Sequence, residues 1–353
     1  MRTITNTRKA AGHFKIAAAA LTLTIAALPS GLLTTAAFAQ TGSVRVAITS
    51  KSLIYAPLYV ALRKGMFDQR GLKVDILDAG GGTKVAAGMA GGSITAAMMA
   101  IDHVFAGTTR DQKWVMFGQL MNKEPYSFAM RKDLAEKKGI TASSPYADRL
   151  KALEGTTIAV STLGSGTQLG LGSAMASAGV PPEKSKWIPI GDPIAILTAL
   201  EHKQVDVAGR APGPAEMAVD RGVGVMVVDF SKDQTGKLYP TIVMATTAAQ
   251  LKDRAEDLRK LTLALRDAMT FTRQHPDEAA SAIRQDFKFM DDKAFKDGLA
   301  FDLRALPEDI LISKDEFGAA VAHNNSPYLL QQRRGVKVSD NYDEAVDVKL
   351  GAK

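Results

Sequence analysis

Residues 44–67, VRVAITSKSLIYAPLYVALRKGMF, place a strand and a helix in direct succession. Val44–Thr49 is short, apolar and rich in β-branched residues, and it predicts the first strand. Pro57 suits the first turn of a helix, and Gly65 suits its end. Between them, the apolar face of the helix comprises Leu58, Tyr59, Ala61 and Leu62. A buried strand followed by an amphipathic helix is a building unit of layered α/β folds.

The same strand–helix unit recurs in two passes along the chain. Ser93–Ala97 and Gln204–Ala208 show the correspondence, because each follows a predicted helix and presents a short apolar strand. The alternation favours parallel α/β layers arranged as two lobes of similar plan. Strands are predicted at 73–77, 93–98, 114–119, 126–131, 157–161, 187–190, 205–209, 223–228 and 241–246, helices at 193–201, 256–275, 277–286, 291–304 and 314–323, and surface loops at 132–144 and 231–237.

Residues 1–39 have the layout of a secretory signal peptide. Four basic residues and no acidic ones precede the apolar run Ile16–Leu28, and Ala37-Phe38-Ala39 offers small residues to a signal peptidase. A retained membrane anchor is the alternative, but the 13-residue apolar run is shorter than the roughly 20 residues that a spanning helix needs. We therefore expect export and cleavage before Gln40. A bacterial lipid anchor is not expected, because no cysteine follows the run.

Removal of the signal peptide lowers the formal charge of the chain. The whole chain has 353 residues with 44 basic and 37 acidic side chains, a formal charge of +7. Cleavage leaves 314 residues with 40 basic and 37 acidic side chains, a formal charge of +3. So small a surplus does not indicate a nucleic-acid partner, which requires a clustered basic face.

Enzymatic motifs are missing from the sequence. The chain has no cysteine, which excludes disulfides, thiolate nucleophiles and Cys-ligated zinc. The histidines after residue 39 do not have metal-ligand spacing. Leu163 replaces the first glycine of a G-x-S-x-G elbow, and Leu169 replaces the third glycine of a dinucleotide fingerprint. We therefore predict no catalytic residues, no metal and no cofactor, and a protein that is not an enzyme.

Two glycine-rich turns, one in each pass, each lead from a strand into a helix. The free N–H groups at a helix N-terminus attract anions, and glycine lets a ligand approach the backbone. The alternative is that the glycines only permit tight turns. We predict ligand binding by two groups of residues, Gly81, Gly82 and Thr83 in the first turn and Ser165, Gly166 and Thr167 in the second.

Arg210 follows the predicted strand at 205–209, where the carboxyl ends of α/β strands face a ligand crevice. A guanidinium there can bind a carboxylate or sulfonate through two parallel hydrogen bonds; an interlobe or surface ion pair is the alternative. Asp102, at the equivalent end of a first-lobe strand, either balances Arg210 or caps the next helix. Ser52 and Tyr55 are further candidates for the ligand site. For Tyr55, packing in the core or hinge is the alternative.

The sequence resembles a known family of transport proteins. The motifs are Ala56–Phe67 and Gly71–Val74 in the first pass, and Leu153–Val160 and the Ser165-Gly166 turn in the second. They are similar to those of the nitrate/sulfonate/taurine-type substrate-binding proteins of bacterial ABC transporters, a branch that includes binders of a thiamine pyrimidine precursor. The resemblance covers most of residues 43–280. Lys203 stands where the family often has glycine, and Thr95 where it often has aspartate.

The resemblance implies a two-lobed periplasmic-binding-protein fold of type II, in which each lobe is a mixed sheet flanked by helices. Lobe 1 would comprise residues 43–128 and 242–353, and lobe 2 residues 129–241, with hinge crossings at 126–128 and 239–241. It also implies a periplasmic receptor, expected to be monomeric, that captures a small organic anion and delivers it to an ABC permease in the inner membrane. A pyrimidine-precursor binder, a sensory subunit and a synthase-like enzyme are the alternatives. The resemblance does not identify the solute.

Overall fold

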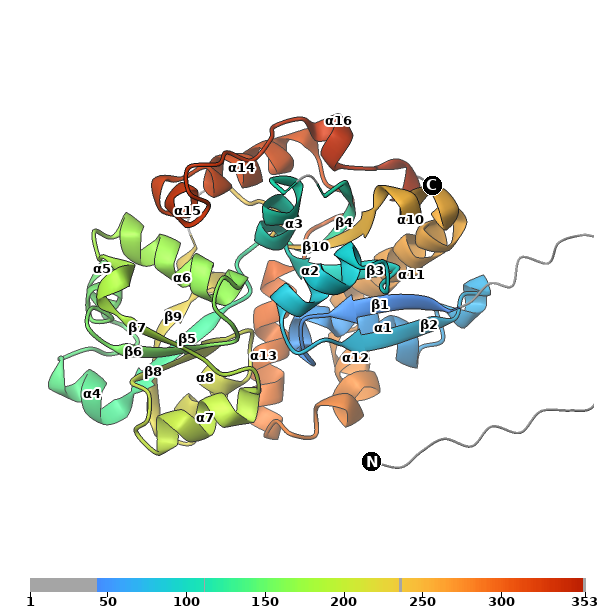
Figure 1. Cartoon of the computed structure of the whole chain (residues 1–353). Helices are drawn as coiled ribbons and strands as arrows, with labels where there is room; N and C mark the ends of the chain where they lie inside the picture. Colours follow the sequence, from blue (N-terminus) through green and yellow to red (C-terminus); the bar gives the residue numbers. More distant parts are fainter. Residues whose placement is uncertain (1–42, 111, 235–236, 352–353) are drawn as a thin grey trace, which may run out of the picture. The chain divides into compact units, whose positions relative to one another are not determined.

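The computed structural model describes residues 43–110, 112–234 and 237–351, so the predicted signal peptide lies outside the described residues. The chain forms two five-stranded sheets with helices on both faces of each (Figure 1). We call each sheet with its helices a lobe. Within the described ranges, no helix has both the length and the apolar character that a membrane span requires.

The first sheet has the strand order β2-β1-β3-β10-β4. β1 pairs in parallel with β2 and β3, whereas β10 pairs antiparallel with both β3 and β4. Its strands are β1 (Val44–Ile48), β2 (Val74–Asp78), β3 (Ala96–Ala100), β4 (Trp114–Met121) and β10 (Ile242–Thr247).

The second sheet repeats this plan with the order β7-β6-β8-β5-β9. β6 pairs in parallel with β7 and β8, and β5 pairs antiparallel with β8 and β9. Its strands are β5 (Ser127–Arg131), β6 (Thr157–Val160), β7 (Lys186–Pro189), β8 (Val207–Arg210) and β9 (Gly224–Asp229).

The strand–helix alternation predicts parallel sheets, and this prediction is wrong for one strand in each sheet. β5 and β10 are the first strands after the chain passes from one sheet to the other, and both run antiparallel to their neighbours. No crossover helix returns the chain to the same sheet at these points, so nothing imposes the parallel direction there. The mixed sheets implied by the family resemblance are thus confirmed, while the lobe boundaries at 128 and 241 stay a prediction.

Helices cover both faces of each sheet. The helix predicted at 193–201 is confirmed. Asp192 caps its N-terminus by accepting a hydrogen bond from the Ala195 N–H at 2.8 Å. The helices of the first lobe are α1 (Ala56–Arg63), α2 (Gly82–Ala90), α3 (Ile101–Thr108), α10 (Ala248–Asp253), α11 (Ala255–Gln274), α12 (Pro276–Ile283) and α14 (Lys314–Asn324); those of the second are α4 (Lys132–Lys137), α5 (Tyr146–Lys151), α6 (Gly166–Ser177), α7 (Pro193–Glu201), α8 (Pro214–Asp220) and α9 (Phe230–Asp233).

The two segments predicted as surface loops each contain a short helix. α4 forms because Ala135 is fully buried beneath an otherwise polar turn. α9 forms because Phe230 is buried and Asp229 caps the helix by accepting a hydrogen bond from the Ser231 N–H at 3.1 Å. A single buried side chain in a polar segment gives no periodic pattern, so the sequence did not predict these helices.

The C-terminal part of the chain contacts both lobes. α13 (Asp292–Ala305) packs against α8, where Lys293 Nζ lies 2.6 Å from a carboxylate oxygen of Asp220. α15 (Pro327–Gln332) packs against α6, and α16 (Tyr342–Ala345) against β4. Tyr328 lies so close to α6 that a Cβ on Gly172 would be 2.2 Å from its hydroxyl. The lobes are therefore joined by helix packing as well as by the two chain crossings.

Lys203 has a backbone conformation that glycine adopts more readily than other residues. Its φ is 58°, in the left-handed region where a side chain costs roughly 1–2 kcal/mol. Its Nζ lies 3.0 Å from a carboxylate oxygen of Asp133. That ion pair is exposed and offsets little of the cost.

Gly209 in β8 supplies a test of the second sheet. It is paired with Phe128 of β5, and a Cβ on Gly209 would lie 1.6 Å from the Phe128 ring. We expect Gly209→Ala to lower the free energy of unfolding by about 1–3 kcal/mol, because the buried ring has to move. Gly318→Ala in α14 is the matched control, since no atom lies within 4 Å of its Cβ. Denaturant midpoints that fall equally in both variants would contradict this packing.

Candidate functional site

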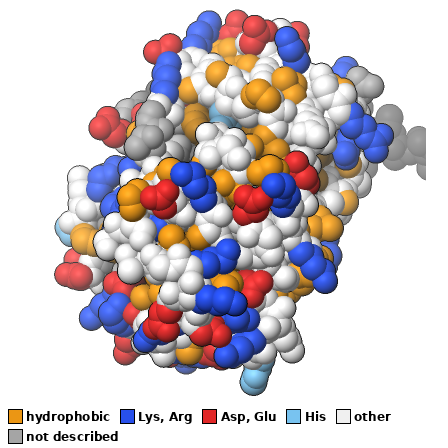
Figure 2. Space-filling view, turned by 90° about the vertical axis from the view of Figure 1, so that its left-hand side faces the viewer, with side chains coloured by type: hydrophobic (Ala, Val, Ile, Leu, Met, Phe, Trp, Pro, Cys, Tyr) orange, Lys and Arg blue, Asp and Glu red, His pale blue; other side chains and the backbone are white. Residues whose placement is uncertain are grey.

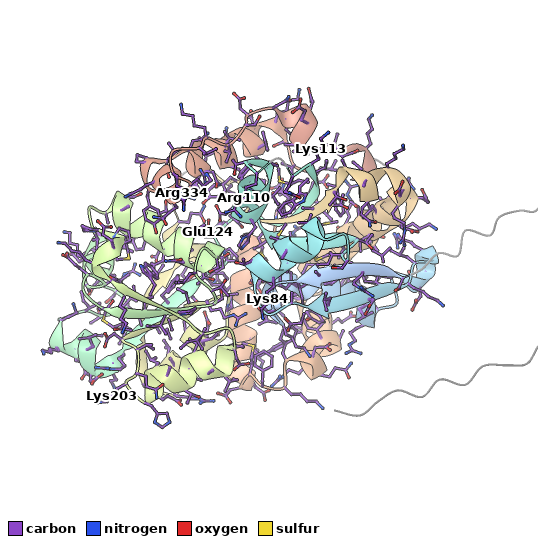
Figure 3. The ribbon with its side chains drawn as sticks, viewed as in Figure 1. Lys84, Arg110, Lys113, Glu124, Lys203 and Arg334 are labelled. Carbon is purple, nitrogen blue, oxygen red and sulfur yellow. The ribbon has the colours of Figure 1, made fainter. Side chains whose placement is uncertain are left out.

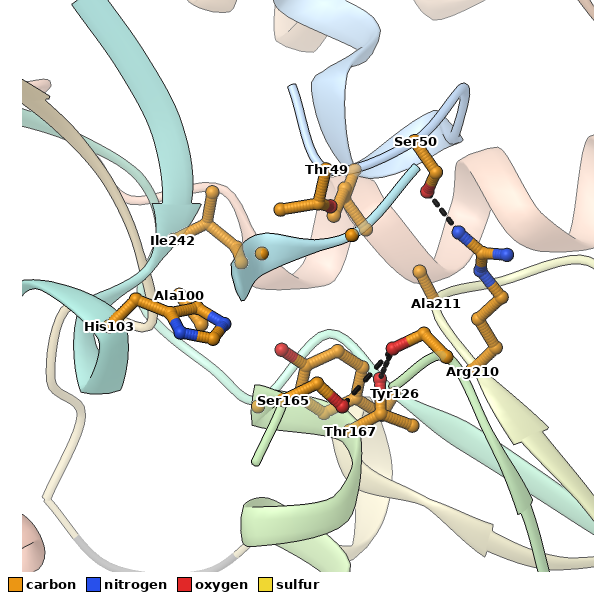
Figure 4. Close-up of a pocket in the computed structure, with 15 residues that line it drawn as sticks. Thr49, Ser50, Ala100, His103, Tyr126, Ser165, Thr167, Arg210, Ala211 and Ile242 are labelled. Carbon is orange, nitrogen blue, oxygen red and sulfur yellow. Dashed lines mark hydrogen bonds between the residues drawn. The ribbon is translucent and has the colours of Figure 1, made fainter. Parts of the chain in front are cut away.

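A cavity of about 30 Å³ lies where the carboxyl ends of the parallel strands of both sheets meet (Figure 4). This is the crevice in which open α/β sheets bind ligands. The volume is room for about two water molecules, so the lobes must separate to admit an organic solute. The lining residues are Thr49, Ser50, Ile54, Gly81, Gly82, Ala100, His103, Tyr126, Ser161, Ser165, Gly166, Thr167, Arg210, Ala211 and Ile242.

Arg210 is the only charged residue among those that line the cavity, with 5% of its surface exposed. Its guanidinium donates a hydrogen bond to the Ser50 hydroxyl, across the cleft (Figure 4). It donates another to the Gly191 carbonyl. No carboxylate of the described residues lies within ion-pair distance of it. Burial lowers the pKa of Arg210, and the more distant Asp78 and Asp192 oppose this effect. A buried cation without an anion is costly, and a bound anion would offset that cost.

Hydroxyl groups from the same lobe as Arg210 also line the cavity. Ser161 donates to the Ser165 hydroxyl at 3.1 Å and lies 3.3 Å from that of Thr167, at the N-terminus of α6 (Figure 4). Burial raises the pKa of Tyr126 well above its usual range, so its hydroxyl stays protonated and can donate. Burial lowers the pKa of His103 despite the nearby Asp102, so its imidazole is neutral at pH 7.

Two of the turn glycines allow the lobes to approach closely. Gly81, with φ 151°, lies against Thr162 of the other lobe, whose methyl group would be 3.0 Å from a Cβ. A Cβ on Gly166 would lie 2.3 Å from the Tyr126 hydroxyl and 2.8 Å from Ala100. The glycines therefore do more than permit tight turns: any larger side chain would hold the cleft open.

Six of the ten predicted binding residues line the cavity. The structure brings together Gly81, Gly82, Ser165, Gly166, Thr167 and Arg210. Ser52, Tyr55, Thr83 and Asp102 lie elsewhere.

Ser52 and Tyr55 support the cavity wall from behind. Ser52 caps the short 3-10 helix η1 (Leu53–Tyr55) by accepting a hydrogen bond from the Ile54 N–H at 3.5 Å. The hydroxyl of the fully buried Tyr55 lies 2.8 Å from the Thr49 hydroxyl and donates to the Met98 carbonyl at 3.1 Å. Tyr55 thus holds Thr49 in the wall. Its ring belongs to the core, which the sequence analysis gave as the alternative to ligand binding.

Thr83 and Asp102 lie on helices that start at the cavity but face away from it. Thr83 is in the first turn of α2 and is exposed to solvent. Asp102 is in the first turn of α3, lines a neighbouring cavity, and neither caps the helix nor pairs with Arg210. Consecutive helix residues point roughly 100° apart, so His103 reaches the cavity and Asp102 does not.

The sequence analysis did not include several lining residues among the candidates. Thr49, Ser50 and Ser161 come within two residues of the carboxyl end of a strand, and Arg210 is the last residue of one, so the same positional signal identifies them. His103 and Ile242 have no such local signal, because tertiary packing places them.

The two chain crossings are hydrogen-bonded to each other beside the cavity. Tyr239 in one crossing donates its hydroxyl hydrogen bond to Glu124 in the other at 2.9 Å. Thr241 donates its backbone N–H to the Met121 carbonyl at 2.9 Å. Burial, with a contribution from Asp102, raises the pKa of Glu124 to about 8. His323 from α14 stacks on Tyr239 with ring centroids 4.6 Å apart.

The polar side chains of the lining can donate hydrogen bonds or carry positive charge, and no carboxylate is among them. Within the described part of the chain, no group of three or more acidic or histidine side chains is placed to hold a metal ion. The arrangement therefore suits a ligand that carries negative charge or strong hydrogen-bond acceptors.

Comparison with known proteins agrees with this architecture. Solved structures that share the fold include a protein of Bordetella bronchiseptica RB50 (TM-score 0.75, 22% identity, 87% of this chain and 95% of the other). They also include the alkanesulfonate-binding protein SsuA of Xanthomonas axonopodis pv. citri bound to MOPS (0.67, 14%, 87% and 98%). The periplasmic nitrate-binding protein NrtA of Synechocystis PCC 6803 is a third (0.67, 13%, 88% and 88%). The chain thus has the periplasmic-binding-protein fold.

The family is identified by the sequence itself. Residues 54–279 match the profile described as NMT1/THI5 like, so the chain belongs to the NMT1/THI5-like family. No curated protein sequence matches the chain. The fold is also found in a desulfurization enzyme, DszB (TM-score 0.57, 16% identity, 87% of this chain and 97% of the other), so the fold alone does not decide between binding and catalysis.

Glu124 provides a test of the crossing between the lobes. Its pKa is about 8 in the folded protein against an ordinary 4.5, so the folded state keeps a proton that the unfolded chain releases. The free energy of unfolding therefore falls as pH rises from 5 to 8. Glu124→Gln removes this effect and keeps an acceptor for Tyr239. Relative to the wild type, the variant should gain roughly 3 kcal/mol across this range.

Urea unfolding at several pH values measures this difference. The exposed Glu136→Gln is the control and should show no pH-dependent gain over the wild type. A constant difference between Glu124→Gln and the wild type would show that Glu124 is not protonated in the folded protein.

Proposed function

We propose that this protein is an exported solute-binding receptor that captures a small organic anion, of the sulfonate or carboxylate class, between its two lobes. The observation that carries the proposal is Arg210, a buried guanidinium at the end of β8 with no carboxylate partner among the described residues. An anion in the cavity would meet Arg210 from one side and the N-termini of α2 and α6 from others. Each of these groups favours negative charge.

Closure of the lobes provides the signal that a ligand is bound. A ligand that contacts both lobes stabilises the closed state by its higher affinity for that state. The Arg210–Ser50 hydrogen bond already joins the lobes in the closed arrangement. Bending occurs at the crossings that contain Glu124 and Tyr239, because these are the covalent connections between the sheets.

The partner of the closed form is an ABC permease in the inner membrane, and the protein acts as a periplasmic monomer. This part of the proposal is supported by membership of the NMT1/THI5-like family and by a fold shared with ligand-binding proteins such as SsuA and NrtA. On the face shown in Figure 2, Lys and Arg side chains stand among Asp and Glu side chains rather than in a patch of one sign. Such a surface does not suit nucleic acid.

The anion-binding role of Arg210 is tested by calorimetry. The probes are ethanesulfonate, taurine, benzoate, nitrate and an aminopyrimidine. We expect one of the anions to bind to the wild type, and Arg210→Met to weaken that binding by about 100-fold, because a charge-assisted bidentate contact is lost. The thermal midpoint of the unliganded variant should not fall, because the substitution also removes a desolvated charge.

Two further variants distinguish the effect of the Arg210 charge from that of its bidentate geometry and from a general loss of charge. Arg210→Lys keeps the charge without the bidentate geometry, and an intermediate affinity is expected. The exposed Lys113→Gln removes a charge elsewhere and should leave affinity unchanged. Binding of the aminopyrimidine alone, or an anion affinity that does not depend on Arg210, would contradict the proposal.

Export makes a separate prediction. The mature protein recovered from the periplasm should begin at Gln40, because signal peptidase recognises the small residues Ala37 and Ala39. Intact mass and N-terminal sequencing measure this directly. A protein that keeps residues 1–39 and sediments with the membrane would show that the segment is an anchor.

A further inference from the structure

A second cavity, of about 470 Å³, adjoins the candidate site and shares His103 with it. Its volume lies in the range of small-molecule sites, roughly 300–1,000 Å³. We call it the second compartment. Its walls come from α3 and the turn that follows it in the first lobe, from Gly164 and Leu169 near the start of α6, and from residues 329–336 after α14. Closure of the lobes therefore shapes this compartment as well as the first.

Positive charge gathers in the second compartment. Arg110, Arg333 and Arg334 line it, and Asp102 is the one acidic residue among its lining residues. The side chains of Arg110 and Arg334 are labelled next to each other in Figure 3. Within the described ranges, neither guanidinium donates a hydrogen bond or forms an ion pair. Among the described residues, the lining of the compartment thus carries two positive charges more than its single carboxylate balances.

The segment that carries Arg333 and Arg334 is held in place from both lobes. Arg333 donates to the side-chain oxygen of Asn324 at 3.2 Å and to its backbone carbonyl, which fixes the segment to α14. Tyr328 fixes it to α6 by its contact with Gly172. Arg334 has φ 54°, a conformation that a non-glycine residue adopts at a cost of roughly 1–2 kcal/mol. The turn therefore holds a strained arginine at the wall of the compartment.

His103 is the boundary between the two compartments. Gly82 permits this position, because a Cβ there would lie 2.1 Å from the imidazole Nε2. The neutral imidazole can donate one hydrogen bond and accept another, so it can contact a polar part of a ligand at this boundary. A ligand that passes His103 meets Arg210 on one side and the group Arg110, Arg333 and Arg334 on the other.

We propose that the second compartment binds a second acidic group of the same ligand, so that the solute is an elongated dianion such as a dicarboxylate or a sulfocarboxylate. The inference rests on the proposed function, since Arg210 holds the first acidic group. The second group neutralises the charge excess of Arg110, Arg333 and Arg334 and connects α3 with the C-terminal segment. A monoanion of the same size makes only the Arg210 contact.

Calorimetry with matched pairs of anions tests the proposal on the whole mature protein. The pairs are hexanoate with adipate, and benzoate with 4-sulfobenzoate. In the wild type, the dianion of at least one pair should bind about 10-fold more tightly than its monoanion. Arg110→Gln and Arg334→Gln should each weaken dianion binding about 5-fold or more, leave monoanion binding unchanged, and together abolish the preference. Lys113→Gln, an exposed residue outside this compartment, is the matched control.

The two proposals fail differently in this experiment. A preference for dianions that survives in the Arg110→Gln/Arg334→Gln double variant, or its absence in both wild-type pairs, overturns the second compartment alone. Anion affinities that are unchanged in Arg210→Met overturn the proposed function.

A second measurement applies whether or not a panel member binds. Thermal midpoints are compared in sodium sulfate and sodium chloride at equal ionic strength, which gives the sulfate-specific gain for each variant. Because the second compartment takes an oxyanion on its own, the gain should persist in Arg210→Met and fall in the Arg110→Gln/Arg334→Gln double variant. Equal gains in the double variant and in the wild type overturn the proposal.

Discussion

A guanidinium removed from water without a carboxylate partner is the constraint around which this cleft is organised. Arg210 extends from the end of β8 to Ser50, which follows β1 in the other sheet, and its remaining acceptor is the Gly191 carbonyl. These two neutral contacts use two of the five N–H donors of the guanidinium and leave its charge unbalanced. Residues that would compete for that charge, such as Asp78 and Asp192, are occupied by backbone N–H groups. The charge therefore stays available to a ligand, and closure places it next to two helix N-termini.

The way the lobes are joined limits how this charge can be exposed. Glu124 and Tyr239 tie the two crossings together, and α13 and α15 add helix contacts between the lobes. Opening must break the α15–α6 contact at Tyr328 or carry the C-terminal segment along with α6. If the segment moves with α6, Arg333 and Arg334 change position relative to α3; if the contact breaks, they stay with α14 and move relative to α6. Ligand capture and the position of the C-terminal segment are therefore coupled, because the same motion of the lobes changes both.

The sequence predicted those features that depend on local signals. Asp192 and Pro193 determine where α7 begins, and alternation of apolar runs locates the strands to within a few residues. The position of Arg210 at a strand end was sufficient to place it in the crevice. Local signals do not determine which way a side chain faces. Tyr55 lies in η1 after β1 and Tyr126 directly before β5, and their local sequence does not show that Tyr55 supports the wall from the core while Tyr126 forms part of it.

The sequence also does not determine which side chains of α3 point into which cavity. A step of one residue along the helix changes the compartment that a side chain lines. Asp102 faces the second compartment, where it partly balances three arginines, and His103 stands between the two cavities. The arginines come from the turn after α3 and from a segment more than 200 residues later, so no sequence motif joins them. The first cavity, at about 30 Å³, is too small in the closed state for an organic anion, whereas the second, at about 470 Å³, is not. A solute that spans both would need only a small separation of the lobes at Arg210, because most of its volume lies beyond His103.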